Sequence, residues 1–465
     1  MAESSTAALP EAAAVPSTPA PLEAPQDTVA EAVTPPPAPK PAKPERLVSL
    51  DAYRGFIMLA MASGGLGFVA VIRLAGRSLG QLVGTQFAPL PGVGEVGLAA
   101  FDPHLPMSPL WQTLAYQFDH VAWVGCAFWD LIQPSFMFMV GVAMPYSHAA
   151  RLAKGQSTAT IWKHVFIRSL ILILLGIFLS SNWSKQTNFT FVNVLTQIGL
   201  GYACTHLFLG RGLKAQLAGL AAILVGYWAY FVLTPVTWPA DVRAYGLPAD
   251  WPLLDGLAAH WNKDLNAAAT FDQWFLNLFP REQTFWFSSG GYQTLNFIPS
   301  MATMLLGVIA GELLRADALR TRKFVQLLVA GFICFGLGLL AGATICPLVK
   351  RIWTPSWALY STAFCFWMLA AFYGVVDVLG WQRWTFPLVV VGMNSIAIYV
   401  MAQLTKPWVR DTLRIHFGKD VFDGTYFGLQ LFHPVYAPIA EAVLMLGVWW
   451  LACWWLYRQK IFIKI

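Results

Sequence analysis

Charged residues are scarce in this sequence. Only 12% of its 465 residues are Asp, Glu, Lys or Arg, while 57% are hydrophobic. Soluble domains use roughly 25% charged residues, so this balance excludes an ordinary soluble protein and indicates a membrane protein embedded in a lipid bilayer. The net charge of +6 does not indicate a nucleic-acid partner, because most basic residues follow the pattern of membrane sidedness described below.

Paired cysteines are also missing. The six cysteines lie singly within or near apolar runs and show no Cys-x-x-Cys spacing. The sequence therefore indicates neither a zinc site nor a disulfide framework, and no bound metal is expected. We expect the cysteine side chains to pack in the core; they are Cys126, Cys204, Cys334, Cys346, Cys365 and Cys453.

The first part of the chain lacks the residues that build a core. Residues 1–45 are mostly Ala, Pro, Glu and Thr with almost no large hydrophobic residues, which predicts a disordered tail. No charged segment is followed by a short apolar segment there, which argues against a cleavable secretory signal. Lys40, Lys43 and Arg46, just before the first apolar run, favour a cytoplasmic N-terminus.

Long apolar runs are abundant after residue 45. Ten of them approach the roughly 20 residues that span a bilayer, and 18 of the 30 Lys and Arg residues fall in the loops then assigned to the cytoplasm. We predict one all-α polytopic domain (46–465) of about ten transmembrane helices, with both termini in the cytoplasm and an extracytoplasmic cap of loops at about 76–119, 234–294 and 405–434. The runs are 53–75, 121–148, 166–181, 192–209, 215–233, 295–314, 324–343, 357–379, 386–404 and 435–456.

Two ionisable residues belong to the second run, His120 at its outer end and Asp130 inside it. An unpaired ionisable side chain inside a bilayer costs several kcal/mol, so His120 and Asp130 need a reason to be there. On an ideal helix their ten-residue separation is a rise of about 15 Å and a rotation of about 280°, which predicts that they mark two depths and do not form a dyad. Pro134 has no N–H for the carbonyl of Asp130, which predicts a broken helix and a polar cavity reaching inward from His120.

His120 can carry chemistry. A neutral imidazole is a general base near pH 7 and can also act as a nucleophile toward an activated acyl group. The alternative, favoured by composition alone, is an interfacial histidine that is hydrogen-bonded to a loop. Asp119 is adjacent, but neighbours on a helix do not face one another, so it is a weak candidate for orienting His120.

Other polar residues have two interpretations each. Asp51 and Arg54 lie three residues apart, which predicts an ion pair along a helix; the pair either ends a span or helps to hold a polar cofactor. Asn394, with Ser395, lies in the ninth run, where polar side chains usually join helices. Glu441 and Asn296 are further polar points beneath the predicted cap, and for both we favour a structural role.

The order of these motifs resembles the heparan-α-glucosaminide N-acetyltransferase family of transmembrane acyltransferases. The resemblance rests on an opening Arg-x-x-Ser-Leu-Asp-x-x-Arg-Gly at 46–55, on Pro387 with Gly-Met-Asn-Ser at 392–395, and on the closing segment 457–465. It also rests on the pattern His120, Trp123, Asp130, Pro134, Phe136, Phe138 and Gly141.

The resemblance implies the transfer of an acetyl group from cytoplasmic acetyl-CoA to a sugar on the far side of the membrane. It places the family's active histidine at His120 and its membrane-buried aspartate at Asp130. Three family elements are changed: an Asn of the first span is absent from 61–65, an Arg is replaced by Gln197, and an Asp-Pro-Glu-Gly element is replaced by residues 289–292. These changes leave the acceptor open.

The sequence hypothesis is a bacterial inner-membrane acyltransferase that acts on an amino sugar or a cell-envelope glycan. Acetyl-CoA would enter past Asp51 and Arg54 toward Asp130, and His120 would act as base or as acyl acceptor. Asn394 would polarise the thioester carbonyl. A transporter or flippase is the alternative, because polar broken spans also line substrate paths. The oligomeric state stays open, a homodimer included.

Overall fold

The computed structural model describes most of the chain after residue 46. The predicted tail at 1–45, with Lys40, Lys43 and also Arg46, lies outside the described residues, as do loop residues 84–108 with His104, and Lys464. The described residues are 47–83, 109–236, 238–418, 420–423, 425–426 and 429–463.

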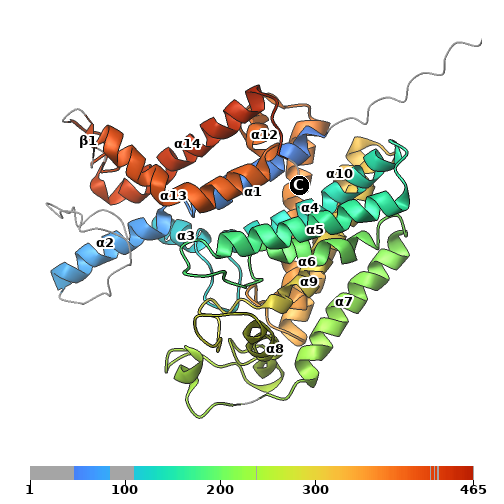
Figure 1. Cartoon of the computed structure of the whole chain (residues 1–465), viewed down its shortest axis with the longest axis horizontal. Helices are drawn as coiled ribbons and strands as arrows, with labels where there is room; N and C mark the ends of the chain where they lie inside the picture. The colour runs from blue at the N-terminus through green and yellow to red at the C-terminus, as the bar shows by residue number, and fades with distance from the viewer. Residues whose placement is uncertain are drawn as a thin grey trace, which may run out of the picture. The chain divides into compact units, whose positions relative to one another are not determined.

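Helices dominate the described residues (Figure 1), which confirms the predicted all-α polytopic class. In addition to short 3-10 turns, one antiparallel strand pair is present, β1 (Thr425–Tyr426) with β2 (Leu429–Gln430). The α-helices of this part of the chain are α1 (Val48–Ser63), α2 (Phe68–Val83), α3 (Pro109–Gln117), α4 (Ile132–Leu152), α5 (Thr158–Ser180), α6 (Val194–His206), α7 (Leu213–Leu233), α8 (Ala267–Phe275), α9 (Phe297–Arg315), α10 (Arg320–Thr344), α11 (Pro355–Tyr373), α12 (Phe386–Gly392), α13 (Ser395–Phe417) and α14 (Ala437–Arg458).

The number of candidate spans is lower than predicted. Within the described ranges, seven helical segments are long and apolar enough to cross a membrane, or eight if the bent pair α12 and α13 counts as one span. The predicted runs 121–148 and 192–209 correspond to α4 and α6, which are not among these. The 13 residues of α6 are too few for the roughly 20 that a bilayer requires.

The ninth predicted run differs most from the structure. α12 ends at Gly392, the chain bends by 65°, and α13 then continues to Phe417. Much of the loop predicted at 405–434 is therefore helical, because a helix can extend beyond the point where its sequence stops being apolar. α13 lies beside α14 (Figure 1).

Glycines divide the first predicted run into α1 and α2. Gly64 caps α1 with a φ of 61°, and Gly65 and Gly67 have φ values of 85° and 74°, a region that side chains disfavour. A Cβ at Gly65 would lie 2.9 Å from the carbonyl oxygen of Phe118, and one at Gly67 would lie 2.5 Å from that of Pro438. The break therefore brings other backbone segments close to the end of α1.

α4 and α9 pack closely at small residues. A Cβ at Gly141 would lie 1.9 Å from the carbonyl oxygen of Met304, and one at Gly307 would lie 2.2 Å from that of Phe138. Small residues of this kind allow membrane helices to approach closely. About 67% of the apolar stretch within Thr294–Arg315, which includes α9, is buried inside the protein, compared with 22% of the apolar stretch of α10. α9 is therefore central and α10 peripheral.

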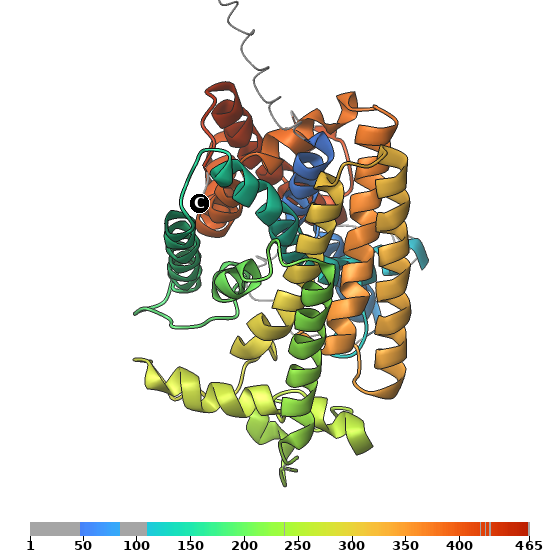
Figure 2. The same cartoon turned by 90° about the vertical axis from the view of Figure 1, so that its right-hand side faces the viewer.

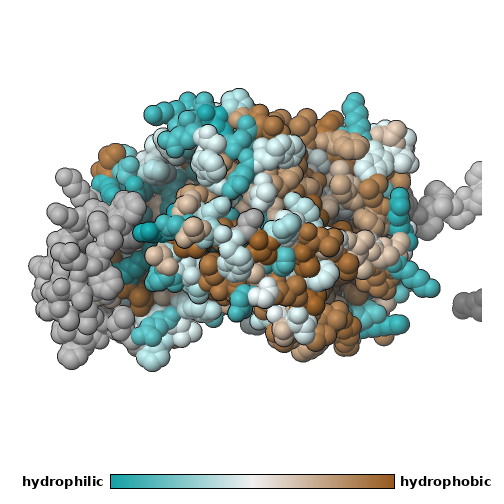
Figure 3. Space-filling model, turned by 90° about the horizontal axis from the view of Figure 1, so that it is seen from below, coloured by the Kyte–Doolittle hydropathy of each residue, from teal (hydrophilic) through white to brown (hydrophobic). Residues whose placement is uncertain are grey.

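α10 and α11 lie side by side as a hairpin (Figure 2). The outer face of α10 exposes large apolar residues such as Phe332 and Leu340, and α5 exposes Phe166 in the same way. Figure 3 shows hydrophobic residues gathered over much of one face of the molecule. Apolar surface of this extent is expected where helices contact lipid.

Candidate active site

The residues around His120 form a loop and not the start of a helix. Residues 118–127 contain turns and bends, a 3-10 turn follows at Phe128–Leu131, and α4 begins only at Ile132. The predicted start of the second span at residue 121 is therefore wrong. Pro134 lies in the first turn of α4, where a missing N–H costs little, so it does not break a span.

His120 and Asp130 form a dyad. The Nδ1 atom of His120 lies 2.7 Å from Oδ1 of Asp130. The prediction that these residues could not pair was wrong because it assumed one continuous helix between them. The loop instead folds back, and the backbone N–H groups of Val121 and Ala127 donate to Oδ2 of Asp130 at 3.3 and 3.1 Å. The bond from Ala127 caps the 3-10 turn at the residue that precedes it, as a capping carboxylate does.

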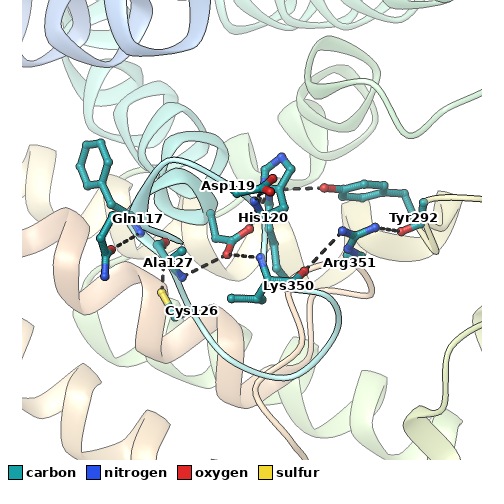
Figure 4. A network of polar contacts seen from close by, with 12 residues as sticks. Gln117, Asp119, His120, Cys126, Ala127, Tyr292, Lys350 and Arg351 are labelled. Atoms are coloured by element: carbon teal, nitrogen blue, oxygen red, sulfur yellow. Dashed lines mark hydrogen bonds and ion pairs between the residues drawn. The ribbon is translucent and has the colours of Figure 1, made fainter. Parts of the chain in front are cut away.

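Lys350 completes the cluster from the loop between α10 and α11. Its Nζ atom lies 3.1 Å from Nδ1 of His120, 3.4 Å from Oδ1 of Asp130 and 3.4 Å from the hydroxyl of Tyr292. The side chains of Lys350 and Asp130 are only 4% and 1% exposed. Figure 4 shows Lys350, Arg351 and Tyr292 turned toward the loop that carries His120. The two buried charges compensate each other, as buried charges must.

The geometry favours one form of His120. Nδ1 faces both a carboxylate and an ammonium group, and it cannot donate to the first while accepting from the second. The contact with Asp130 is the shorter, at 2.7 Å against 3.1 Å, and a bond to a carboxylate is charge-assisted. We therefore assign the proton of the neutral ring to Nδ1. Nε2 then carries the lone pair, on a side chain that is 33% exposed.

Asp130 is held as a carboxylate. Burial by itself raises the pKa of this group, but the hydrogen bond from His120, the positive charge of Lys350 and the N–H of Ala127 together lower the pKa below its ordinary value. A carboxylate that stays ionised can keep orienting the imidazole while the ring gains and loses protons.

Backbone contacts fix the loop that carries Lys350. The Thr354 hydroxyl accepts from the N–H groups of Trp357, at the start of α11, and of Val349. Val349 pairs with Val124 in a β-bridge, and the N–H of Gly125 donates to Leu348 at 3.0 Å. The loops of His120 and Lys350 are thus joined by backbone bonds, which reduces the freedom of both side chains.

Arg351 and Tyr292 join a third segment to this site. Arg351 donates to the carbonyl oxygens of Gly290 and Val121, the second at 3.3 Å. Its guanidinium and the Lys350 ammonium lie 5.5 and 5.7 Å from the ring centre of Tyr292, within the range of cation–π attraction. The changed element 289–292 therefore forms one wall of the site.

Sequence reasoning missed Lys350 and Arg351. A signal was present, because the positive-inside rule predicts few basic residues in a short outer loop, and these two are adjacent in the loop predicted between the seventh and eighth runs. Two neighbouring exceptions to the rule could have been paired with the buried carboxylate of Asp130.

Two further carboxyl groups are buried in the loop region at 234–294. Asp264 and Asp272 are 2% and 1% exposed. Burial raises the pKa of each to about 7, although polar neighbours such as Lys263 near Asp264 and the N–H of Thr294 near Asp272 act in the opposite direction. This part of the chain therefore changes charge near neutral pH.

The other predicted site residues are placed outside the cluster. Arg54 lies 3.7 Å from Asp51, which confirms the ion pair within the helix. One turn away, Phe56 packs on Phe128 with ring centres 6.3 Å apart, so α1 contacts the turn that holds Asp130. Asn394 donates to Ile461 and accepts from the N–H of Ile463 at 3.1 and 3.0 Å, so its amide holds the C-terminal segment.

The remaining polar points have structural contacts. Asn296 donates to the carbonyl oxygen of Arg351 at 2.7 Å, and Glu441 lies 3.9 Å from Arg414. Asp119 accepts from the N–H of His120 at 2.7 Å and lies 3.6 Å from Arg73. These contacts agree with the structural role favoured for Asn296 and Glu441 and with a minor role for Asp119. The polar cavity leading inward from His120 stays a prediction.

Comparison with known proteins finds two relatives of this chain. No protein-family model matches it. The heparan-alpha-glucosaminide N-acetyltransferase of Homo sapiens is 25% identical to it over 90% of this chain and 68% of the human protein. The protein of the same name from Mus musculus is 25% identical over 75% of this chain, and this match spans 57% of the mouse protein, less than two thirds of its length.

Proposed function

The chain is a relative of the heparan-alpha-glucosaminide N-acetyltransferases, and from that premise we propose that it transfers an acetyl group from acetyl-CoA to an amino sugar or a cell-envelope glycan. At the level of the family, the similarity supports an acyltransferase that crosses the membrane several times. The observation that carries the proposal is the cluster of His120, Asp130 and Lys350, in which Nδ1 is held and Nε2 is left to act.

In the direct route, the nitrogen or oxygen of the acceptor attacks the carbonyl carbon of the acetyl thioester. Nε2 of His120 takes the acceptor's proton, the carbon–sulfur bond breaks, and the proton passes to the departing thiolate. In the two-step route, Nε2 attacks the thioester first, the carbon–sulfur bond breaks and the thiolate leaves. The acceptor then attacks the acetyl-imidazole, the bond from carbon to Nε2 breaks, and the acceptor's proton passes to the thiolate. Both routes build positive charge on the ring, and the Asp130 carboxylate stabilises it.

Lys350 acts in this proposal as a positioning residue. Its charge balances that of Asp130, so the buried carboxylate stays ionised without extracting a proton from His120. Its bond to Tyr292 also fixes the distance between the His120 loop and the wall at 289–292.

Asp51 and Arg54 remain our candidates for polar contacts with the donor, because Phe56 connects their helix to the turn of Asp130. We propose a bacterial inner membrane as the location, and the cytoplasmic termini that the charge pattern predicts would place this end of α1 on the side of acetyl-CoA. We propose a different role for Asn394, since its amide is already occupied by the segment near Ile461.

The test uses membrane vesicles that contain the protein, with labelled acetyl-CoA on the cytoplasmic face and amino sugars on the other face. We expect His120→Ala to lower the transfer of label by about 10²- to 10⁴-fold, the usual contribution of a general base. His416→Ala is the matched control, because His416 is exposed near the end of α13.

Transfer that survives in His120→Ala would contradict the proposed role of the imidazole. Movement of the sugar across the membrane without consumption of acetyl-CoA would favour a transporter, whose sites are often built at broken helices such as α12 and α13.

A further inference from the structure

A second polar site lies at the other end of α4. A cavity of about 230 Å³ opens among α4, α5 and α6, with His148 and Arg151 from α4, His164 and Arg168 from α5, and His206 from α6 on its walls. From Ile132 to His148, α4 advances about 24 Å at 1.5 Å per residue, so this cavity is well separated from Asp130.

The fixed charges around the cavity are both positive and belong to Arg151 and Arg168. Three histidines line it beside them, and among the described residues of its lining there is no Asp or Glu. Neither Arg151 nor Arg168 forms an ion pair with a described residue. A cavity between apolar helices is a costly place for uncompensated cations, so the lining favours an anionic occupant.

The side chains around the cavity are held in place, but some of their buried polar atoms have no hydrogen-bond partner among the described residues. Arg168 lies 4.7 Å from the ring centre of Tyr202 and donates to its hydroxyl at 3.3 Å, which fixes the guanidinium. Its Nε atom and Nδ1 of His148 are buried, and neither has a hydrogen-bond partner among the described residues. His206 packs edge-on against His148 and Trp162, with ring centres 5.3 and 5.0 Å apart. Buried polar atoms of this kind are rarely left without a hydrogen-bond partner.

We propose that this cavity binds the phosphate group of a phosphate ester. A phosphate offers several charged acceptor oxygens, which match the planar fork of an arginine and the N–H groups of histidines. Ile167 and Ile171 form part of the lining and are themselves 43% and 42% exposed, so the cavity borders the apolar surface of α5. An occupant with a phosphate and a less polar chain fits both features.

Two sources can supply this chemistry. One is the nucleotide end of coenzyme A, whose long arm could extend along α4 toward Asp130; this source rests on the proposed function. The other is the headgroup of an anionic phospholipid in the surrounding bilayer, which does not. The phosphate chemistry of the cavity is the same in both cases, and the test separates them.

The experiment measures binding by the purified full-length protein in detergent. Adenosine 3′,5′-bisphosphate and inorganic phosphate are titrated by calorimetry, and retained phosphatidylglycerol is measured by native mass spectrometry. We expect Arg151→Gln to weaken phosphate binding about tenfold and Arg151→Gln with Arg168→Gln to weaken it further, because each lost charge-assisted bond is worth about one decade of affinity. Arg211→Gln, an equal charge change at an exposed residue just after α6, should have no effect.

Binding of the bisphosphate that is lost in the double variant would support the site and assign it to the nucleotide. Retention of phosphatidylglycerol alone, with the same loss, would support the site and assign it to lipid. Equal binding by wild type and double variant, or no binding of any probe, would overturn the proposal. Melting temperature and elution volume verify that the variants are folded; if the double variant is not, the single Arg151→Gln variant decides. Acetyl transfer is measured separately, so failure of the proposed reaction leaves this result intact.

Discussion

Histidines and basic side chains gather at both ends of α4, but among the described residues they have an acidic partner at only one of the two ends. Just before the first residue of α4, His120 and Lys350 surround the buried carboxylate of Asp130, and both oxygens of this carboxylate accept hydrogen bonds. Near its last residue, histidines and arginines surround a cavity, and buried polar atoms such as Nδ1 of His148 have no partner among the described residues.

The difference separates a preorganised reaction site from a binding site. At the first end the protein supplies the counter-charge itself, so the geometry of the imidazole is fixed before any substrate arrives. At the second end the counter-charge is left for a ligand to supply. Each of the following changes tests one side of this contrast.

Replacing the shared carboxylate should have the largest effect. Asp130→Asn removes the negative charge that holds the proton on Nδ1 of His120, offers the ring an amide donor instead, and leaves Lys350 without its counter-charge. We expect acetyl transfer to fall by about 10³-fold, measured in the vesicle assay, with phosphate binding at the α4–α6 cavity unchanged. Asp119→Asn is the matched control, because its carboxylate lies beside the cluster and is half exposed. Equal losses in both variants would show that the effect is not specific to the dyad.

Removing the cation of the cluster should have an intermediate effect. Lys350→Met leaves Asp130 buried with His120 as its one ring partner, so the imidazole is displaced from its working position. We expect transfer to fall about 100-fold and stability to fall by about 3 kcal/mol, as when a buried ion pair is broken, with partial recovery in Lys350→Arg. The measurements are transfer rate and melting temperature.

The control for Lys350 is Lys263→Met, a second buried lysine of the outer loops that donates to Ser289 at 3.0 Å. It should lose stability without a comparable loss of transfer. If Lys350→Met lowered only the melting temperature, its ammonium would serve the fold and not the orientation of His120.

Raising the pH should have the smallest effect on acetyl transfer, because it acts on stability through carboxyl groups of the outer loops that lie outside the cluster. Asp264 and Asp272 have pKa values raised to about 7, so the folded state keeps their protons at pH values where the unfolded state has released them. Stability should therefore decrease as pH rises from about 4 to 7, by up to about 2 kcal/mol per carboxyl between pH 5 and 7. Asp272→Asn should flatten this decrease in melting temperature, whereas Asp250→Asn, at an exposed site, should not. A decrease of equal slope in both variants would contradict the raised pKa of Asp272.

The sequence was sufficient for the class of fold, and it singled out His120 and Asp130, which the structure brings together. Hydropathy located the long helices, because an apolar run of about 20 residues is typical of a transmembrane helix. It located the ends of those helices poorly, and this caused the error at Asp130. The turn before α4 depends on bonds from Val121 and Ala127 to one carboxylate, which no window average of hydropathy can detect.

Lys350 shows a different limit. It lies 230 residues after His120, and only the folded chain brings the two loops together. The β-bridge between Val124 and Val349 that sets this approach is made by backbone atoms, so its side chains carry no pattern that a single sequence could reveal. By contrast, the pair Asp51 and Arg54 lies within one helical turn, and spacing alone predicted it.

The glycine break after α1 limits how the site can vary. The carbonyl that approaches Gly65 belongs to Phe118, two residues before His120, and the one that approaches Gly67 belongs to Pro438 of α14. A methyl group at either position would press on one of these two segments. The absence of side chains at Gly65 and Gly67 therefore links the position of the His120 loop to that of α14, a helix more than 300 residues later in the chain.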